Sequence, residues 1–210
     1  MVSVIILDLG NVLAFFDRSK TYKRLSEFVP HTPEEIGELI ESSGLRRRFE
    51  LGEMADAEFF LRIMDLFEPP HNVDFELFCR IWGDIFNTNR ALLKILSKVN
   101  PQTRLVLLSD TNVLHFESIQ RNHPEILELF DDRIVLSFRE GFAKPDHRIY
   151  SKALEVAGGS CDFPDCLYVD DNLENVTAAV QLGMIGHHYV GLYEFVTRLR
   201  QLEIIPDLRK

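Results

Sequence analysis

Short apolar runs alternate with amphipathic segments over most of the chain, and these runs predict strands. Val4-Ile5-Ile6-Leu7, within an expected strand at residues 2–9, is continuously apolar and largely β-branched, which suits a strand buried on both faces of a parallel sheet. Similar runs predict further strands at residues 105–108, 134–136, 166–169 and 185–189. Between them, apolar positions recur at helical spacing. We therefore expect an α/β fold, with a doubly wound, Rossmann-like parallel sheet and right-handed crossovers.

The segment from residue 17 to residue 88 carries apolar residues at helical spacing only. Thr32 precedes Pro33 and Glu35, which forms a capping box with proline at the first helical position, and the helix is expected to end at Gly44. Further helices are expected at residues 22–29, from about residue 56 to Pro69-Pro70, and at residues 78–86. The pattern predicts no strand in this segment.

Aromatic residues indicate that this helical segment has a core of its own. Ten of the sixteen phenylalanines lie before residue 90, which supplies enough aromatic volume for a small domain. We therefore predict a core domain formed by residues 1–16 and 89–210, with a small α-helical domain, residues 17–88, inserted after the first strand. At 210 residues the chain is long enough for this arrangement.

The composition is that of an ordinary globular protein, with 46% apolar and 27% charged residues. The formal net charge of −10 argues against nucleic-acid binding but leaves small anionic substrates open. No apolar run is long enough to span a membrane, and Asp8 interrupts the N-terminal apolar stretch too early for a signal peptide. The three cysteines lack a zinc-like spacing, so we expect reduced thiols and a cytoplasmic location. A monomer and a homodimer both fit this composition.

Polar residues with complementary chemistry follow four of the expected strands. They are Asp8, Ser109, Lys144 (in the loop after its strand) and the pair Asp170-Asp171. Ligands of open α/β sheets bind outside the carboxyl ends of the strands, so we expect these side chains to converge there. Three carboxylates repel one another unless a cation lies among them, and oxygen ligands of this kind suit Mg2+.

The same set of residues predicts phosphoryl transfer. Ser109, at a helix start, is suited to hold a phosphoryl group, and Lys144 supplies a positive charge to neutralise it. With Asp8 as nucleophile, the reaction would pass through an aspartyl-phosphate. Each residue alone also has a structural explanation as a turn aspartate, a helix N-cap, a solvated loop lysine or a surface turn. Their shared position at strand ends favours the catalytic interpretation.

These motifs resemble those of the haloacid dehalogenase (HAD) superfamily of hydrolases, and the resemblance spans the whole chain. Residues 5–13, 107–109, 143–146 and 169–172 resemble its four motifs in order. The helical insertion after the first strand is similar to the family's cap. Asp8-Leu9-Gly10-Asn11-Val12, Ser109-Asp110-Thr111-Asn112 and Asp170-Asp171-Asn172 most resemble the sugar-phosphatase branch, which includes alpha-glucose-1-phosphate phosphatases.

The resemblance implies a Mg2+-dependent hydrolase that acts on a small, sugar-like phosphomonoester. Asp8 would be the nucleophile and a Mg2+ ligand, and the Gly10 carbonyl with a carboxylate of Asp170 or Asp171 would complete the metal's protein ligands. The phosphate-binding residues would be Ser109, Asp110 and Lys144.

Two positions depart from the family's common phosphatase pattern. The second aspartate, which usually stands two residues after the nucleophile as general acid and base, is replaced by Gly10. Asp17 or a residue of the cap would have to replace it, and a positioned general acid is typically worth about 10²–10⁴ in rate. Asp110 stands where related sequences often have asparagine. Its negative charge beside a phosphate is unfavourable unless the side chain turns away or pairs with a cation.

Two other clusters have both a functional and a structural interpretation. The segment from Arg46 to Glu53 joins two predicted cap helices and resembles the family's substrate-facing loop, while its three arginines also suit a helix C-terminus. His187 and His188 are neighbours on a strand and therefore point in opposite directions, which argues against a shared metal.

Two other functions compete with the phosphatase hypothesis. A 2-haloacid dehalogenase also uses a nucleophilic aspartate and lacks the second one, but it does not need Asp170-Asp171. A catalytically degenerate protein, without its acid at Gly10, would bind a phosphorylated ligand or a partner instead. The sequence leaves the substrate open.

Overall fold

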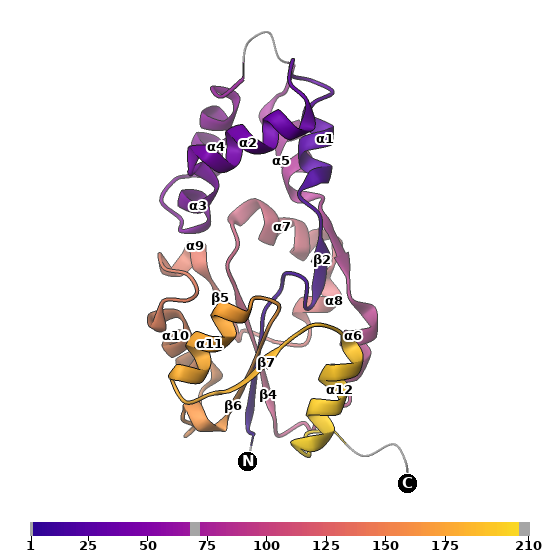
Figure 1. Cartoon of the computed structure of the whole chain (residues 1–210), viewed down its shortest axis with the longest axis vertical. Helices are drawn as coiled ribbons and strands as arrows, with labels where there is room; N and C mark the ends of the chain where they lie inside the picture. The colour runs from indigo at the N-terminus through magenta and orange to yellow at the C-terminus, as the bar shows by residue number, and fades with distance from the viewer. Residues whose placement is uncertain (1, 68–71, 206–210) are drawn as a thin grey trace.

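The computed structural model describes residues 2–67 and 72–205. Its central feature is a five-stranded parallel sheet in the order β5-β4-β1-β6-β7 (Figure 1). The strands are β1 (Val4–Leu7), β4 (Arg104–Ser109), β5 (Ile134–Leu136), β6 (Cys166–Asp170) and β7 (Ile185–His188). Since β1 lies in the middle and the chain extends the sheet on both sides of it, the predicted doubly wound α/β fold is confirmed.

Helices cover both faces of the sheet, as the continuous apolar strands predicted. In β1, Ile5 and Leu7 pack with α6 (Arg90–Leu96) and α12 (Leu192–Gln201). Val4 and Ile6 face the opposite way, toward α10 (His147–Ala157) and α11 (Leu173–Gln181). The remaining core helices are α7 (Val113–Asn122), α8 (Pro124–Leu127), α9 (Ser137–Glu140) and the short 3-10 helix η1 (Phe163–Asp165).

The helical insertion lies beyond the carboxyl ends of the strands, at the top of Figure 1. It contains α1 (Ser19–Leu25), α2 (Pro33–Ser43), α3 (Leu45–Glu50), α4 (Asp56–Met64) and α5 (Phe75–Gly83). These helices share a hydrophobic cluster that includes Phe49, Phe59, Phe78 and Trp82. At the start of α2 the predicted capping box is present, since Thr32 N donates to Glu35 Oε2 at 2.8 Å and Glu35 N donates to Thr32 Oγ1 at 3.3 Å. We refer to this insertion as the cap.

Two short strands, β2 (Ala14–Phe16) and β3 (Phe86–Thr88), form an antiparallel pair where the cap joins the core. The prediction that residues 17–88 are entirely helical is therefore wrong at β3. Helix α5, the last of the four helices expected here, ends at Gly83 instead of continuing through Phe86, because the chain there lies against α7 and then pairs with β2. We propose the domain division at residues 16/17 and 88/89, where this pair ends.

Other expectations about the cap have mixed outcomes. The segment from Arg46 to Glu53, expected as a loop between helices, is helical as far as Glu50. Pro69 and Pro70, where we expected the third helix to end, lie outside the described residues.

Within residues 2–67 and 72–205, no helix is both long enough and apolar enough to cross a membrane. All three cysteines are free thiols.

Candidate active site

Three of the predicted site residues meet at the carboxyl ends of neighbouring strands, on the side of the sheet that faces the cap. Asp8 follows β1, Ser109 ends β4 and Asp170 ends β6. The register aligns Leu7 with Val169 across the β1–β6 pair, so the two aspartates that follow lie at the same level of adjacent strands. All three side chains are buried.

Lys144 enters this cluster from the loop between α9 and α10. Its Nζ lies 2.7 Å from Asp8 Oδ1 and 2.9 Å from Asp170 Oδ2, and its side chain is only 3% exposed. The loop is fixed to the end of β4 because Lys144 N donates a hydrogen bond to Asp110 Oδ1 at 3.0 Å. Burial lowers the pKa of Lys144, but the surrounding carboxylates raise it by more, so the ammonium stays charged.

The two neighbouring aspartates after β6 have different surroundings. Asp170 Oδ2 accepts hydrogen bonds from Lys144 Nζ, from the Tyr168 hydroxyl and from Asn175 Nδ2. Burial opposes ionisation of Asp170, but Lys144 and the hydroxyl of Tyr168 outweigh it and lower the pKa. Asp171 is half-buried, and its carboxylate accepts one hydrogen bond from the described residues, from Asn11 Nδ2 at 2.9 Å.

The residues present fit a divalent cation with oxygen ligands. One carboxylate oxygen from each of Asp8, Asp170 and Asp171 lies within 4.8 Å of the others. The Gly10 carbonyl accepts no backbone hydrogen bond from the part of the chain that the structure describes, so its lone pairs are available. Few protein ligands, all of them oxygen, are typical of Mg2+, which keeps several waters. Of the two aspartates after β6, Asp171 has the freer carboxylate.

The charge balance around Asp8 also favours a cation. Burial raises the pKa of Asp8, the charge of Lys144 opposes this shift, and Asp170 and Asp171 add to it. A single lysine thus does not compensate three clustered carboxylates. A bound divalent cation would favour the ionised form of Asp8, which is the form that can attack as a nucleophile.

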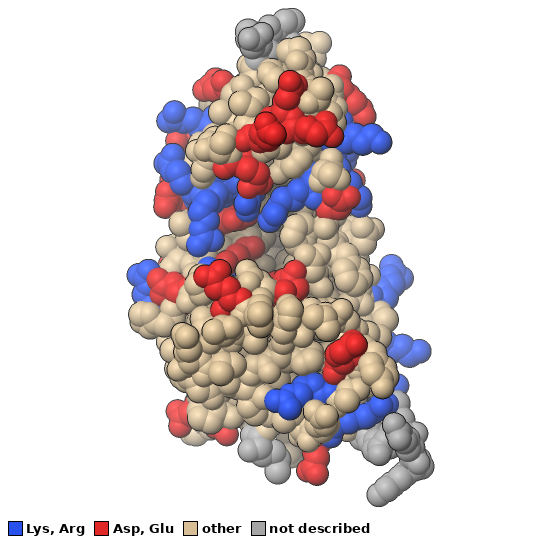
Figure 2. All heavy atoms as spheres, in the orientation of Figure 1, with Lys and Arg blue, Asp and Glu red and all other residues tan. Residues whose placement is uncertain are grey.

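A narrow pocket of about 40 Å³ lies between this cluster and the cap. Its polar wall includes Ser109, Asp110, Thr111, Arg18 and Glu50, and its apolar wall includes Leu9, Phe16, Ile85 and Phe86. In Figure 2 this face of the molecule is hollowed between cap and core, with blue side chains along the edge of the cap and red ones along the edge of the core. The pocket therefore offers both positive charge and apolar surface to a substrate.

The Asp110 carboxylate pairs with donors of its own, as its negative charge beside a phosphate site requires. Its Oδ1 accepts from Lys144 N, and its Oδ2 lies 3.8 Å from Arg47 Nη1 of the cap. The carboxylate is thus directed to two donors. Its phosphate-binding role stays a prediction, and these two contacts are those of a residue that positions the Lys144 loop.

The general acid missing at Gly10 has two candidate replacements, Asp17 and a residue of the cap. A Cβ on Gly10 would lie 2.8 Å from Phe16 Cε1, so the ring of Phe16 occupies the space beside this position. Asp17 is exposed, and hydrogen bonds from the hydroxyl and the backbone N–H of Ser19 lower the pKa of its carboxyl. A general acid needs the opposite shift. Asp17 is also absent from the residues that line the pocket, so a residue of the cap is the better placed candidate.

Several residues of the site were not predicted. Tyr168 and Asn175 both donate to Asp170, and Asn11 donates to Asp171. Tyr168 has a readable signal, because residues two apart on a strand share a face. Glu50 lies in the segment that resembles the family's substrate-facing loop, although it was not singled out there, whereas Arg18 has no such signal because its place over the core depends on how the cap docks.

The two neighbouring histidines have separate structural roles, as expected. His188 Nε2 contacts the backbone oxygen of Asp171 at 2.9 Å. His187 packs against Phe195, and burial lowers the pKa of its imidazole. The two side chains do not share a site.

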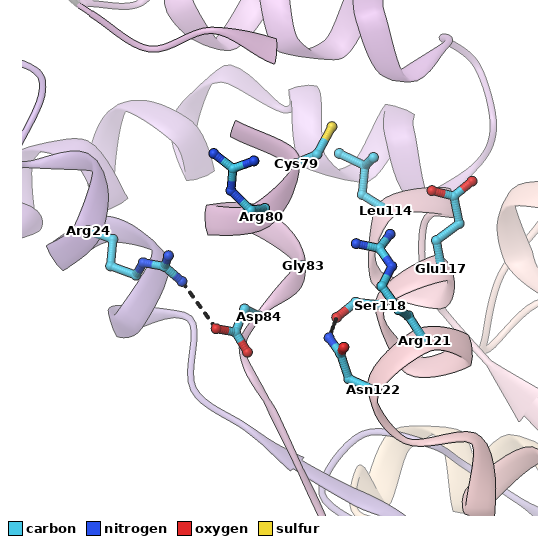
Figure 3. A pocket seen from close by; sticks show the side chains of 10 residues that line it. All are labelled: Arg24, Cys79, Arg80, Gly83, Asp84, Leu114, Glu117, Ser118, Arg121 and Asn122. Carbon is cyan, nitrogen blue, oxygen red and sulfur yellow. Dashed lines mark hydrogen bonds and ion pairs between the residues drawn. The ribbon is translucent and has the colours of Figure 1, made fainter. Parts of the chain in front are cut away.

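A larger hollow, of about 330 Å³, lies between α1 and α5 of the cap and α7 of the core (Figure 3). Arg24, Arg80 and Arg121 line it together with Asp84 and Glu117. Figure 3 shows Arg24 directed at Asp84, with which it forms an ion pair at 3.3 Å. Because its charges are mixed and none of the predicted site residues lines it, this hollow is not the phosphate site.

Comparisons with known proteins agree with this fold. A sesquiterpene phosphatase from Aspergillus oryzae is 38% identical over 87 residues, a match that spans 41% of this chain and 42% of that protein. A HAD family enzyme from Bacteroides thetaiotaomicron, solved in complex with magnesium and inorganic phosphate, superposes with a TM-score of 0.77 at 24% identity, over 89% of this chain and 93% of the other. L-2-haloacid dehalogenase from Xanthobacter autotrophicus superposes with a TM-score of 0.63 at 17% identity, over 99% of this chain and 86% of the other. At such identities the two structures show the shared fold.

Family membership rests on the sequence itself. Residues 2–183, which include Asp8, Ser109, Lys144 and Asp170-Asp171, match the haloacid dehalogenase-like hydrolases. The match covers most of both the core and the cap. The chain therefore belongs to the haloacid dehalogenase-like hydrolase family.

Proposed function

We propose that the chain is a Mg2+-dependent phosphomonoester hydrolase that acts through an aspartyl-phosphate on Asp8. The observation that carries this proposal is the position of Lys144, whose Nζ bridges Asp8 and Asp170 beside the third carboxylate, Asp171. Such a cluster needs a divalent cation and then presents a carboxylate nucleophile to a phosphoryl group. The phosphatase relative and the fold-related enzyme with magnesium and phosphate support the same activity.

The residues divide the chemistry among them. Asp8 attacks phosphorus, and the Lys144 ammonium and the Ser109 hydroxyl hold the phosphoryl oxygens. Asp8, Asp171 and the Gly10 carbonyl, with support from Asp170, would hold Mg2+, which would supply charge stabilisation for the transferring group. The cap covers the pocket and limits the access of bulk water to it. Water then hydrolyses the aspartyl-phosphate and releases inorganic phosphate.

We retain a small, sugar-like phosphate as the proposed substrate class, and we add a second class. Arg18 lines the pocket, and its Nε is buried without a hydrogen-bond acceptor among the described residues, so a polar oxygen of a substrate suits it. The apolar wall formed by Phe16, Ile85 and Phe86 instead favours an isoprenoid-type phosphate, in line with the sesquiterpene phosphatase relative. Both proposed substrate classes are small phosphorylated molecules.

A substrate panel with and without Mg2+ tests this function. The panel should contain sugar phosphates, isoprenoid phosphates and aryl phosphates, and phosphate release should require both Mg2+ and the Asp8 carboxylate. Asp8→Asn is expected to abolish turnover while it preserves the circular dichroism spectrum, because the two side chains are similar in size. Full activity in excess chelator would revive the dehalogenase hypothesis. A folded parent that binds phosphate but hydrolyses no ester would favour the degenerate binding protein.

A further inference from the structure

We infer that Glu50 of the cap is the general acid and base that replaces the aspartate missing at Gly10. The inference rests on the proposed phosphatase function and deepens it. Glu50 is the last residue of α3 and lines the pocket together with Gly10 and Ser109, which the proposed mechanism places at the reacting phosphoryl group. The position two residues after Asp8 is closed to a side chain by Phe16, so an acid has to approach from the cap.

The carboxyl of Glu50 is fixed and has one oxygen free. Its Oε1 accepts a hydrogen bond from Arg46 Nη1 at 2.7 Å. The other two nitrogens of the Arg46 guanidinium, Nε and Nη2, donate to the Glu41 carboxylate. That carboxylate also accepts a hydrogen bond from the Tyr22 hydroxyl. No hydrogen bond is donated to Glu50 Oε2 by the part of the chain that the structure describes. The side chain is 9% exposed, so its remaining access is toward the pocket.

The charged groups around Glu50 come from four elements. Arg46 lies on the same helix, Glu41 on α2, Arg18 at the start of α1 and Asp110 after β4. Burial raises the pKa of Glu50; Arg46 and Arg18 oppose this shift and Asp110 adds to it. Because Glu41 already neutralises much of the Arg46 charge, burial prevails and favours the protonated form of Glu50, which is the form that can donate a proton.

The backbone next to Glu50 is docked on the core, which places this side chain over the active site. The Ser137 hydroxyl donates to the backbone oxygen of Glu50 at 2.6 Å. Two residues later, Gly52 has a φ of +69° and passes so close to Phe138 that an added Cβ would lie 2.1 Å from the Phe138 carbonyl oxygen. Only glycine fits there. In Figure 1, α3 accordingly lies directly above α9.

The proton transfers balance over the two chemical steps. In the first, Asp8 attacks phosphorus, the bond between phosphorus and the ester oxygen breaks, and that oxygen takes the proton of Glu50 and leaves as an alcohol. In the second, the Glu50 carboxylate takes a proton from water as the water oxygen attacks phosphorus. The bond between phosphorus and Asp8 then breaks, its electron pair returns to the carboxylate, and Glu50 is protonated again.

Leaving-group dependence tests this role. For the parent, kcat/KM across phosphate esters of graded leaving-group pKa is expected to vary little, because Glu50 protonates the departing oxygen. Glu50→Gln should lower kcat/KM for alkyl phosphates by about 10²–10⁴ and change aryl phosphates far less. It should also remove the high-pH limb of the kcat/KM profile. Glu58→Gln is the matched control, since Glu58 is an exposed glutamate of the cap that pairs with Arg62 and does not line the pocket, and it should follow the parent.

The outcomes separate this role from a structural one. Equal losses for all esters in a folded Glu50→Gln variant would show that Glu50 only positions the cap or binds substrate, and would overturn the assignment. If Glu50→Gln does not fold, Glu50→Asp carries the test: the retracted acid should slow alkyl esters more than aryl esters, and equal slowing overturns it. A parent inactive on every phosphate ester would overturn the proposed function, whereas an active parent with a steep dependence would overturn only the role of Glu50.

Discussion

Lys144 Nζ lies 2.7 Å from Asp8 Oδ1, and neither of these two side chains is more than 10% exposed. The same nitrogen lies 2.9 Å from Asp170 Oδ2, so one ammonium joins the ends of two adjacent strands. This arrangement gives Lys144 two roles. It compensates buried negative charge in the free protein, and it is close enough to the proposed nucleophile to contact a phosphoryl group bound there.

Lys144→Met is therefore expected to reduce both activity and stability. Loss of one pre-positioned charge donor should lower kcat by about 10²–10³. Two buried carboxylates would lose their partner, which we expect to cost about 3–5 kcal/mol of unfolding free energy. Phosphate release and urea unfolding measure the two effects. Lys152→Met, which removes a partly exposed lysine paired with Glu155 outside the site, is the control and should change neither. A kcat within tenfold of the parent would contradict the role of Lys144.

Asp171→Ala and Asp170→Ala are expected to have different effects on the metal. Asp171 has the freer carboxylate, so its loss should weaken apparent Mg2+ affinity by more than the roughly 10–100-fold typical of an outer-shell partner. Asp170 is saturated by donors that include Lys144, so its loss should lower kcat even at saturating Mg2+. Magnesium titrations of activity distinguish the two. Asp65→Ala, at an exposed position of the cap, is the control. Titration curves of both variants that overlay the parent curve would contradict this assignment.

Most of the core was predictable because its signals are local. Continuous apolar runs such as Val4–Leu7 identify buried parallel strands, and the polar residues that follow them have to lie at one edge of the sheet. The two-stranded pair at the base of the cap was not predictable. Ile85 and Phe86 follow Ile81 and Trp82 at helical spacing, so the pattern extends past Gly83, where tertiary contacts with α7 end the helix.

The site was predictable residue by residue only in the core, whereas in the cap the sequence indicated no more than the segment from Arg46 to Glu53. Asp8, Ser109 and Asp170 are strand-end residues, whereas Glu50 and Arg18 reach the pocket through the placement of the cap. That placement depends on contacts between distant segments, such as Ser137 with Glu50, which leave no periodic signal in the sequence. The closure of the Gly10 position by Phe16 is likewise a tertiary effect.

His115 is expected to make stability depend on pH. Burial lowers the pKa of its imidazole to about 3. The native state therefore keeps His115 neutral, while the unfolded chain binds a proton below the ordinary value of 6.5. Stability that is present above pH 6.5 should thus be lost as the pH falls toward about 3, at up to about 1.4 kcal/mol per pH unit.

Urea unfolding at a series of pH values within that window measures the effect. His115→Gln should flatten the slope, whatever its effect on stability at neutral pH. The residue stacks on Trp82 of the cap at a centroid distance of 6.0 Å, so its protonation should loosen the joint between cap and core. His147→Gln, at an exposed histidine, should leave the slope unchanged. An identical slope in His115→Gln would show that other groups account for acid sensitivity.

Gly10→Ala should destabilise the protein because of Phe16, and the backbone should contribute little. Gly10 does not adopt a positive φ, whereas the added Cβ would lie 2.8 Å from Phe16 Cε1. Overpacking of this kind typically costs about 1–3 kcal/mol. Phe16→Ala removes the ring and loses its own contacts with Phe86 and Arg18, so the four proteins of a double-mutant cycle are needed. We expect a favourable coupling, with Gly10→Ala costing far less in the Phe16→Ala background. The same cost in both backgrounds would show that the ring does not close this position.

If the coupling is found, Gly10→Asp combined with Phe16→Ala provides space for an acid two residues after the nucleophile. That pair should restore hydrolysis of alkyl phosphates to Glu50→Gln, because the carboxyl introduced by Gly10→Asp can then protonate the leaving oxygen in place of Glu50.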